Sequence, residues 1–522
     1  MIKQLCVAFS ILIIGTTAQA QTREKTLIIG MNISDGRTYD PSRQADVSTP
    51  FTIGNTYETL ITVTPDNYEV LKPSLADRWE LSNNNTSWRF YLRDSAKFWN
   101  GKPVTAQDVK FSFDRLKYLK DQPAEFTDNI EKIEIVNNKV LDIFPVNTKE
   151  PLLPILTTVS FAVFSKEELE KVGGIGDVSA KDKDSATKAL DRQSFGSGPY
   201  KMTSWTRNES VVLERNKYWH RPLQFDRVII KHLSESSSQL LAIRNGDIDL
   251  AFNLSSDHIN TLKNHKQIRV ESVASLDYVY MVLTASGELN KNLADRNARL
   301  AVAHSIDYQG IIDGILQGYA IRPPSILPIG MGGTTAKDTH EYGYRLDLSK
   351  AKEYLAKAGL SEGFSFNLSY PTSPILNANT SILAQKIQAD LAKVNIKANL
   401  TPLDTSTSVT QYRTGKAQAA LVSYTIDALE PSLWTKPFVG RIAKRVHWTP
   451  EEHLIKLSET APVEVNLEKR NQMYREFQKL LVEEAVYVNI LQPVYKVAVT
   501  NRLKNVNLTA AGWYMNIGDI SR

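Results

Sequence analysis

Hydrophobic positions along this chain follow two spacings, one typical of strands and one typical of helices. Residues 26–31 (TLIIGM) and 419–424 (AALVSY) are mainly apolar runs of strand length. Residues 87–93 (SWRFYLR) alternate large apolar with polar side chains, as expected of a strand with one buried face. The same criteria predict strands at residues 200–205, 210–215, 248–252, 279–283, 364–369, 396–400 and 486–490, and a hairpin at 132–144 that turns at Asn137-Asn138.

Helices are predicted where apolar residues recur at intervals of three or four. One begins after Thr105, where Asp108 three positions later gives a capping-box pattern. Residues 51–62 suggest a short helix that leads into a strand, and the polar residues 172–193 suggest a surface connection. Further helices are expected at 237–244, 298–316, 350–357, 382–393 and 468–483. Strands that alternate with helices favour an α/β fold with helices packed on sheets.

The first twenty residues have the pattern of a secretory signal peptide. Lys3 gives a positive start, residues 5–14 are apolar, and Ala18-Gln19-Ala20 places small residues at a cleavage site. The apolar run is shorter than the ~20 residues that a spanning helix needs. We expect cleavage after Ala20 and a periplasmic location. The single cysteine, Cys6, lies in this segment, so the mature chain is expected to have no disulfide and no thiolate site.

Composition and charge narrow the class of protein. The chain has 522 residues, 42% hydrophobic and 23% charged, which suits a large core and about two to four structural units. Its net charge of +5 is small for this length, and acidic and basic residues are interspersed. Neither nucleic-acid binding nor membrane-surface binding is favoured.

Sequence motifs for catalysis are missing. Gly196-Ser197-Gly198 has the wrong spacing for a GxSxG elbow, and the chain has no HExxH and no GxxxxGK[ST] motif. Its 8 histidines are scattered, so no metal site is predicted. We therefore expect neither an enzyme nor a cofactor, and keep a periplasmic hydrolase as the alternative from another class.

Three blocks of sequence together resemble solute-binding protein family 5, the periplasmic peptide and nickel binders of ABC importers. The first is LKPSLADRWELSNNNTSWRFYLRDSAKFWNGK at 71–102, followed by PVTAQDVKFSFDRL; the second is GSGPYKMTSWTRNESVVLERNKYW at 196–219. The third joins residues 297–318 with 350–359, which resemble the family's A-x-x-x-A-x-D and KA-x-x-x-L-x-x-AG helices. Together the blocks cover nearly the whole mature chain.

The resemblance implies a two-lobed α/β fold, like the type II periplasmic binding proteins, with an extra inserted domain (cluster C). Residues 21–60, 195–275 and 488–522 would form domain I, residues 61–194 an inserted domain II, and residues 276–487 domain III. The implied function is capture of an oligopeptide or peptide-like ligand by hinge closure and its delivery to an ABC permease. The receptor is expected to be a monomer.

The resemblance also suggests where the ligand binds. Asp427, in SYTIDALEP at 423–431, matches an aspartate that pairs with the ligand's amino terminus in peptide-binding relatives. Its neighbours Tyr424 and Thr425, with Tyr370 and Asn377 from the segment at 370–379, complete the predicted site.

The chain departs from dipeptide-binding relatives at Pro374, where those relatives have an arginine for the ligand carboxylate. Strict dipeptide specificity is therefore not expected, although Arg413 or Lys416 could replace that arginine in space. Longer peptides remain candidates, and so do opine, sugar-like and metal-chelate ligands.

Overall fold

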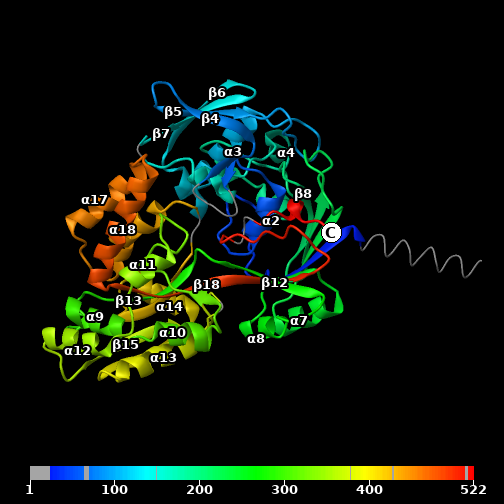
Figure 1. The fold of residues 1–522 in the computed structure, drawn as a ribbon. Helices are drawn as coiled ribbons and strands as arrows, with labels where there is room; N and C mark the ends of the chain where they lie inside the picture. The colour runs from blue at the N-terminus through cyan, green and yellow to red at the C-terminus, as the bar shows by residue number, and fades with distance from the viewer. Residues whose placement is uncertain (1–23, 64–69, 149, 377, 426–427, 512–514) are drawn as a thin grey trace, which may run out of the picture.

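The computed structural model describes residues 24–63, 70–148, 150–376, 378–425, 428–511 and 515–522 (Figure 1). Within them, twelve strands form one hydrogen-bonded network whose two halves share the long strand β18 (Tyr487–Thr500). Figure 1 shows β18 running across the molecule between the two groups of elements. None of the helices described combines the length and apolar character that a bilayer span requires.

The β1 half-sheet has the strand order β11-β1-β10-β9-β8, with β11 and β12 both against the second part of β18. Strand β1 runs parallel to β10 and to β11, while β9 and β8 are antiparallel. The bounds are β1 (Thr26–Met31), β8 (Tyr200–Thr206), β9 (Ser210–Arg215), β10 (Arg227–His232), β11 (Leu250–Ala251) and β12 (Ile268–Ala274).

Strand β1 shows why the sequence of this half-sheet contains continuous apolar runs. Leu27 and Ile29 pack into a cluster on one face, which also contains residues of α2 (Thr49–Thr56). Ile28 packs into a second cluster on the other face, with residues of α7 (Ser236–Asn245) and α8 (Ser256–Asn260). Because both faces of β1 are covered, neither face needs polar side chains, and the strand is apolar throughout.

The β13 half-sheet has the order β16-β15-β17-β13, with β13 against the first part of β18. Strand β15 is parallel to both β16 and β17. The bounds are β13 (Tyr278–Leu283), β15 (Phe364–Pro371), β16 (Ile396–Leu403) and β17 (Ala419–Tyr424); the short β14 (Ala320–Ile321) also pairs with β18.

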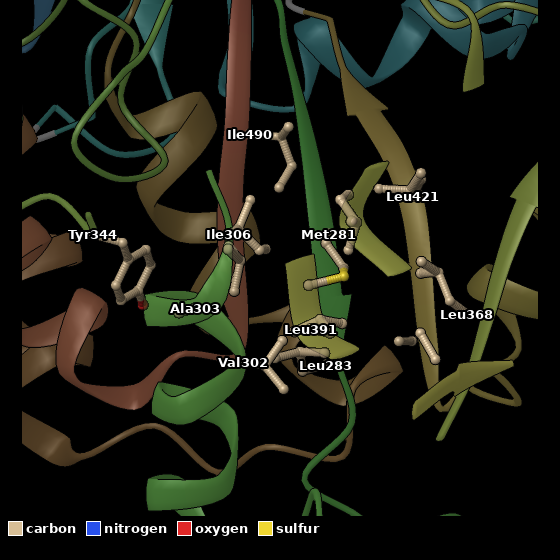
Figure 2. Packing of buried hydrophobic residues seen from close by; sticks show 14 of the residues in the cluster. Met281, Leu283, Val302, Ala303, Ile306, Tyr344, Leu368, Leu391, Leu421 and Ile490 are labelled. Atoms are coloured by element: carbon tan, nitrogen blue, oxygen red, sulfur yellow. The ribbon is translucent and has the colours of Figure 1, made fainter. Parts of the chain in front are cut away.

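Helices cover both faces of the β13 half-sheet. On one face, side chains of β13, β15 and β17 share a hydrophobic cluster with α9 (Arg296–Ser305), α12 (Leu348–Lys357) and α13 (Thr380–Ala392). Figure 2 shows part of this cluster, with Met281 of β13 between Leu421 of β17 and Leu391 of α13. On the other face lie α15 (Ser432–Val439), α16 (Arg441–Arg445), α17 (Glu452–Thr460) and α18 (Leu467–Glu484). Two smaller helices of this part are α11 (Ala336–Glu341) and α14 (Thr405–Arg413).

A separate four-stranded antiparallel sheet, in the order β4-β5-β7-β6, packs with α3 around its own cluster. The predicted capping box is present at the start of α3, where Thr105 and Asp108 bond reciprocally. Bounds are β4 (Ala76–Ser82), β5 (Ser87–Leu92), β6 (Ile130–Asn137), β7 (Val140–Pro145) and α3 (Ala106–Leu119), with β2 (Ile61–Val63) and β3 (Leu71–Pro73) as a small pair beside it. Short helices follow at α4 (Lys166–Glu170), α5 (Ala180–Lys183) and α6 (Thr187–Leu190).

The long helix predicted at 298–316 is wrong, because it breaks after Ser305. Ile306 is extended, and Asp307 caps a new short helix, α10 (Tyr308–Gly310), before a π-helical turn at Ile311–Ile315. Asp307 accepts from the Gly310 amide at 2.9 Å, and its own amide donates to Asp390 of α13 at 3.1 Å. The break therefore depends on a tertiary partner that is distant in sequence.

The surface connection predicted at 172–193 is correct for most of the segment, which is exposed or partly exposed, but not for all of it. The segment forms α5 and α6 and buries Ala180, Ala186 and Leu190. Its Asp184 is a partner of Arg115 on α3, whose side chain is 0% exposed. The lysines of this segment and Val178 are exposed, whereas Ala180, Ala186, Leu190 and the side chain of Asp184 belong to the interior.

Arg115 joins two carboxylates in the interior. Its guanidinium donates to both oxygens of Asp40, at 2.8 and 2.7 Å, and to both oxygens of Asp184, at 2.8 and 2.9 Å. All three side chains are 0% exposed. Burial opposes ionisation of Asp40, but the charge and hydrogen bonds of Arg115 outweigh it and hold the pKa of Asp40 below its usual value.

Candidate functional site

Two strand connections cross between the half-sheets side by side. Residues 275–277 lead from β12 to β13, and β18 passes in the opposite direction from Leu491, opposite Val279, to Val494, opposite Ala274. We call residues 275–277 and 491–495 the crossing point. The strand predicted at 486–490 is thus much longer than expected, because β18 serves both half-sheets.

Both half-sheets direct the carboxyl ends of their parallel strands at the crossing point. In the β1 half-sheet, Leu250 and Ala251 of β11 lie opposite Val499 and Ala498, so β11 and the parallel β1 run toward the crossing point. In the β13 half-sheet, β17 ends at Tyr424 opposite Tyr278, the first residue of β13 beyond the crossing point. Ligands of open α/β sheets bind at carboxyl ends of this kind.

Two asparagines lie at the carboxyl ends of β1 and β11, the edge of the β1 half-sheet near the crossing point. Asn32 follows directly after β1, and its backbone N–H donates to Asn253 Oδ1, two residues beyond β11, at 2.8 Å. The Ser34 amide in turn donates to Asn32 Oδ1 at 3.0 Å. Neither asparagine is among the predicted site residues, although each is a polar residue directly after a predicted strand.

The edge of the β13 half-sheet brings together some of the predicted site residues. Tyr370 near the end of β15 and Tyr424 at the end of β17 lie at the same edge, since these strands are parallel with Ser369 opposite Ala420. Tyr370 is 5% exposed and belongs to the hydrophobic cluster, whereas Tyr424 is partly exposed and Thr425 exposed. Asp427 and Asn377 lie outside the described residues.

Aromatic side chains line this second edge. The Tyr424 ring stacks on Tyr278 at 6.0 Å between centroids, and its hydroxyl donates to the Leu433 carbonyl. Trp434 and Phe438 of α15 lie 6.4 and 5.2 Å from the same ring. The side chain of Tyr424 is thereby fixed in place, with a polar end and a largely apolar environment.

Glu430 is a buried carboxylate in the same segment. It accepts from the Ser432 amide at 3.2 Å and the Tyr474 hydroxyl at 3.4 Å. Burial raises its pKa, and these hydrogen bonds and the charge of Arg470 only partly oppose the increase. With 3% exposure, Glu430 is a structural group of the loop that carries the predicted anchor.

Side chains lock the crossing point itself. Gln492, which is fully buried, donates to the carbonyls of Ser275 and Ile329 and accepts from the Ile329 amide at 2.9 Å. The Tyr495 hydroxyl donates to Asp277. Burial, followed by the charge of Asp277, raises the pKa of Tyr495 well above its usual value, so the phenol keeps its proton.

Side chains also connect the β13 half-sheet to residues 63 and 150, beside the small four-stranded sheet. Lys436 Nζ on α15 lies 3.0 Å from Glu150 Oε1, and both residues are about one-third to two-fifths exposed, at 36% and 43%. Val63 of β2 packs in the same cluster as Tyr278 and Trp434. These contacts hold the two parts together in this conformation.

The structure gives no buried position to the two cations that could replace the arginine for the ligand carboxylate. Pro374 lies in an exposed stretch, and Arg413 and Lys416 are exposed at the end of α14. No group of three or more histidine, cysteine, aspartate or glutamate side chains that could hold a metal ion occurs in the part of the chain that is described.

Comparison with known proteins identifies the family. The model of bacterial extracellular solute-binding proteins, family 5 middle, matches residues 70–442. The chain is 28% identical to the probable D,D-dipeptide-binding periplasmic protein DdpA of Escherichia coli K12, covering 93% of this chain and 92% of that one. It is 24% identical to the dipeptide-binding protein of the same organism, with 93% of each covered.

Solved structures show the same fold. HbpA2 from Haemophilus parasuis matches with a TM-score of 0.82 at 21% identity, over 95% of this chain and 99% of that one. DppA from Helicobacter pylori, in complex with the peptide STSA, matches with 0.75 at 21% identity, over 95% and 97%. The predicted two-lobed α/β periplasmic-binding-protein fold is confirmed, and the chain belongs to the family 5 bacterial extracellular solute-binding proteins.

Proposed function

We propose that this protein is the periplasmic receptor of an ABC importer and binds a peptide-like ligand between its two half-sheets, without catalysing a reaction. The observation that carries the proposal is the convergence of both sets of carboxyl strand ends on one crossing point. The names of the relatives, two of them dipeptide-binding proteins, support a peptide. The receptor acts as a monomer, after cleavage of the signal peptide following Ala20, and delivers its ligand to a membrane permease.

Ligand binding is proposed to close a hinge at the crossing point. Domain I would comprise residues 21–60, 195–275 and 488–522, domain II residues 61–194, and domain III residues 276–487. Among the described residues, two segments, 275–277 and 491–495, join the halves of the large sheet, so small backbone changes there can rotate one half against the other. Asn32 and Asn253 would contact the ligand from one side, and Tyr424, Thr425, Tyr370, Asn377 and Asp427 from the other.

Native mass spectrometry of protein purified without refolding tests the function directly, because a retained ligand is weighed with its receptor. A peptide mass supports the whole proposal. The mass of an opine, sugar or metal chelate would support the receptor function but contradict the peptide ligand. Conversion of added peptides to smaller products by the pure protein would contradict it and favour a periplasmic hydrolase.

Calorimetry with one peptide, free and amidated at its carboxyl end, tests selectivity. We expect affinities within about threefold of each other, because Pro374 has no side-chain donor and the carboxyl end can stay hydrated. A buried carboxylate without a cationic partner would be costly, so the closed site should not enclose one. A large loss on amidation would contradict this expectation and indicate a relocated basic anchor.

Small-angle scattering tests hinge closure. A saturating peptide is expected to reduce the radius of gyration of the wild-type protein. Lys436→Glu replaces the attraction to Glu150 with repulsion, so it should favour the open form and weaken binding by up to about fivefold. Adding Glu150→Lys to this variant should restore both the compact form and the affinity for the peptide. An unchanged radius at saturation would contradict hinge closure.

A further inference from the structure

The two half-sheets also contact each other beside the crossing point, where the Val494 amide donates to the Tyr319 carbonyl at 3.1 Å. Helix α8 packs on the face of the β1 half-sheet opposite α2, and Leu316 packs on the face of the β13 half-sheet opposite α15. Figure 1 shows α8 and α10 on one side of β18, and α3 and α18 on the other. This contact therefore lies on the opposite face of the sheet from the ion pair of Lys436 with Glu150.

Four side chains form a chain of hydrogen bonds between α8 and the segment after the π-helical turn. Gln317 Nε2 donates to Asp257 Oδ1, and Asn260 Nδ2 donates to Gln317 Oε1. The Tyr319 hydroxyl completes the chain by donating to Asn260 Oδ1 at 3.1 Å. A carboxylate only accepts hydrogen bonds, so Asp257 fixes the direction in which both amides point. We call Asp257, Asn260, Gln317 and Tyr319 the α8 contact.

Lys496 of β18 supports the α8 contact from the sheet. Its Nζ donates to Ser256 Oγ at 2.9 Å and lies 4.5 Å from the centroid of the Tyr319 ring. The Ser256 hydroxyl in turn donates to the Leu316 carbonyl at 3.4 Å. A cation over an aromatic ring is attracted to the face of that ring. The ammonium thus contacts residues from both half-sheets, Ser256 from one and Tyr319 from the other.

Gln317 has a backbone conformation that is uncommon for its residue type. Its φ is 54°, in the left-handed region, and the φ of Gly318 is 80°. The π-helical turn at Ile311–Ile315 leads into this pair, and the Gly318 amide donates to the Ile312 carbonyl at 2.9 Å. A left-handed conformation costs free energy in a residue with a side chain. The two hydrogen bonds between Gln317 and α8 offset this cost while the half-sheets keep their present relative position.

We propose that the α8 contact is a conformational device that holds the half-sheets at this angle and so sets how readily the receptor opens. The inference rests on the hinge motion proposed above. Hydrogen bonds have donor–acceptor distances of about 2.7–3.2 Å, so a rotation that displaces Gln317 by more than ~1 Å breaks the chain. Because the pair of Lys436 and Glu150 lies on the opposite face, the two contacts together brace the hinge. Gln317 acts as a positioning residue.

Electron paramagnetic resonance between two spin labels tests the proposal in the ligand-free protein. The labels are attached through Leu241→Cys on α7 and Ile382→Cys on α13, both at exposed positions; the chain's only cysteine, Cys6, lies in the expected signal peptide. Gln317→Glu places a second carboxylate against Asp257, so it should add a population whose label distance differs by more than ~2 Å. Adding Asp257→Asn supplies a donor for the new carboxylate and should restore the wild-type distribution.

Gln309→Glu is the matched control. Gln309 Nε2 donates to Asp313 Oδ1 at 2.9 Å, so the change creates the same repulsion, but both residues belong to one segment of the same half-sheet. It should leave the label distances unchanged. Gln317→Gly removes the side chain where glycine adopts the backbone conformation without strain. It should shift the label distances while lowering the Tm by less than about 3 °C, which separates the hinge effect from a loss of folding.

Three outcomes would overturn the proposal: a wild-type distribution in Gln317→Glu, an equal change in Gln309→Glu, or no recovery when Asp257→Asn is added to Gln317→Glu. All three are measured without ligand, so the result does not depend on the peptide function. Addition of a saturating peptide to the labelled wild type then tests closure separately. Unchanged label distances there would contradict closure on the peptide, whereas the role of the α8 contact is decided by the ligand-free variants.

Discussion

Arg115→Met is expected to lower the free energy of unfolding by about 3–5 kcal/mol near neutral pH, the typical cost of removing one partner from a buried ion pair. Methionine fills a similar length of space but leaves Asp40 and Asp184 without the guanidinium that donates to them and compensates their charge. Arg43 remains, at 3.7 Å from Asp40, and can offset only part of the loss. Urea unfolding of both proteins measures the difference.

The pH dependence separates this electrostatic loss from a packing defect. Because Arg115 holds the pKa of Asp40 below its unfolded value, wild-type stability from this group is present above about pH 4 and declines as the pH falls through the folded pKa. In Arg115→Met, Asp40 can take up a proton instead, so the difference between the two proteins should shrink near pH 4.

Arg215→Met is the matched control for this variant. Its ion pair with Asp226 is 47% and 45% exposed, so its removal should cost less than about 1 kcal/mol at either pH. Equal losses in the two variants, or a loss for Arg115→Met that does not depend on pH, would contradict the role assigned to the buried pair.

Local sequence patterns were sufficient to predict the bounds of elements that are set by burial or by neighbouring residues in the chain. Strands β1 and β17 have the predicted bounds, because a buried strand in a covered sheet is apolar throughout. The helix after Thr105 begins where predicted, because its capping box uses residues three positions apart. Gly246, in a left-handed conformation, ends α7 as its position after the helix indicated.

Elements that depend on distant partners were not predictable from local patterns. The break at Ile306 involves Asp390, more than eighty residues away, and the interior position of Asp184 depends on Arg115. Likewise, a run of β-branched residues cannot show that one strand, β18, pairs with two half-sheets in succession. In each case the sequence gives the propensity, and tertiary contacts decide the outcome.

For the ligand site, the sequence predicted one edge and missed the other. Resemblance directed attention to the segment after β17, and the structure places Tyr424 and Tyr370 at one edge. The amides of Asn32 and Asn253 carry no distinctive motif, and only the parallel pairing of β1 with β11 brings them together. Topology therefore adds what spacing cannot: which strand ends meet at the crossing point.

Asp427→Asn is expected to weaken binding of a peptide with a free amino terminus by more than tenfold. Asp427 follows β17 by three positions in the sequence, and Tyr424, the last residue of β17, lies opposite Tyr278 beside the crossing point. An ammonium enclosed by hinge closure needs a charged acceptor, since a buried charge without one loses a few kcal/mol and each ~1.4 kcal/mol is a factor of ten. Asparagine keeps the shape and one acceptor oxygen but removes the charge.

Calorimetry with one peptide, unmodified and acetylated at its amino end, isolates this pair. Acetylation removes the ammonium, so Asp427→Asn should change the affinity for the acetylated peptide by less than about threefold. Asp404→Asn is the matched control, because Asp404 is an exposed cap of α14 in the same part of the chain and asparagine caps helices equally well. If both peptides weaken equally in Asp427→Asn, or neither does, Asp427 is not the amino-terminal anchor.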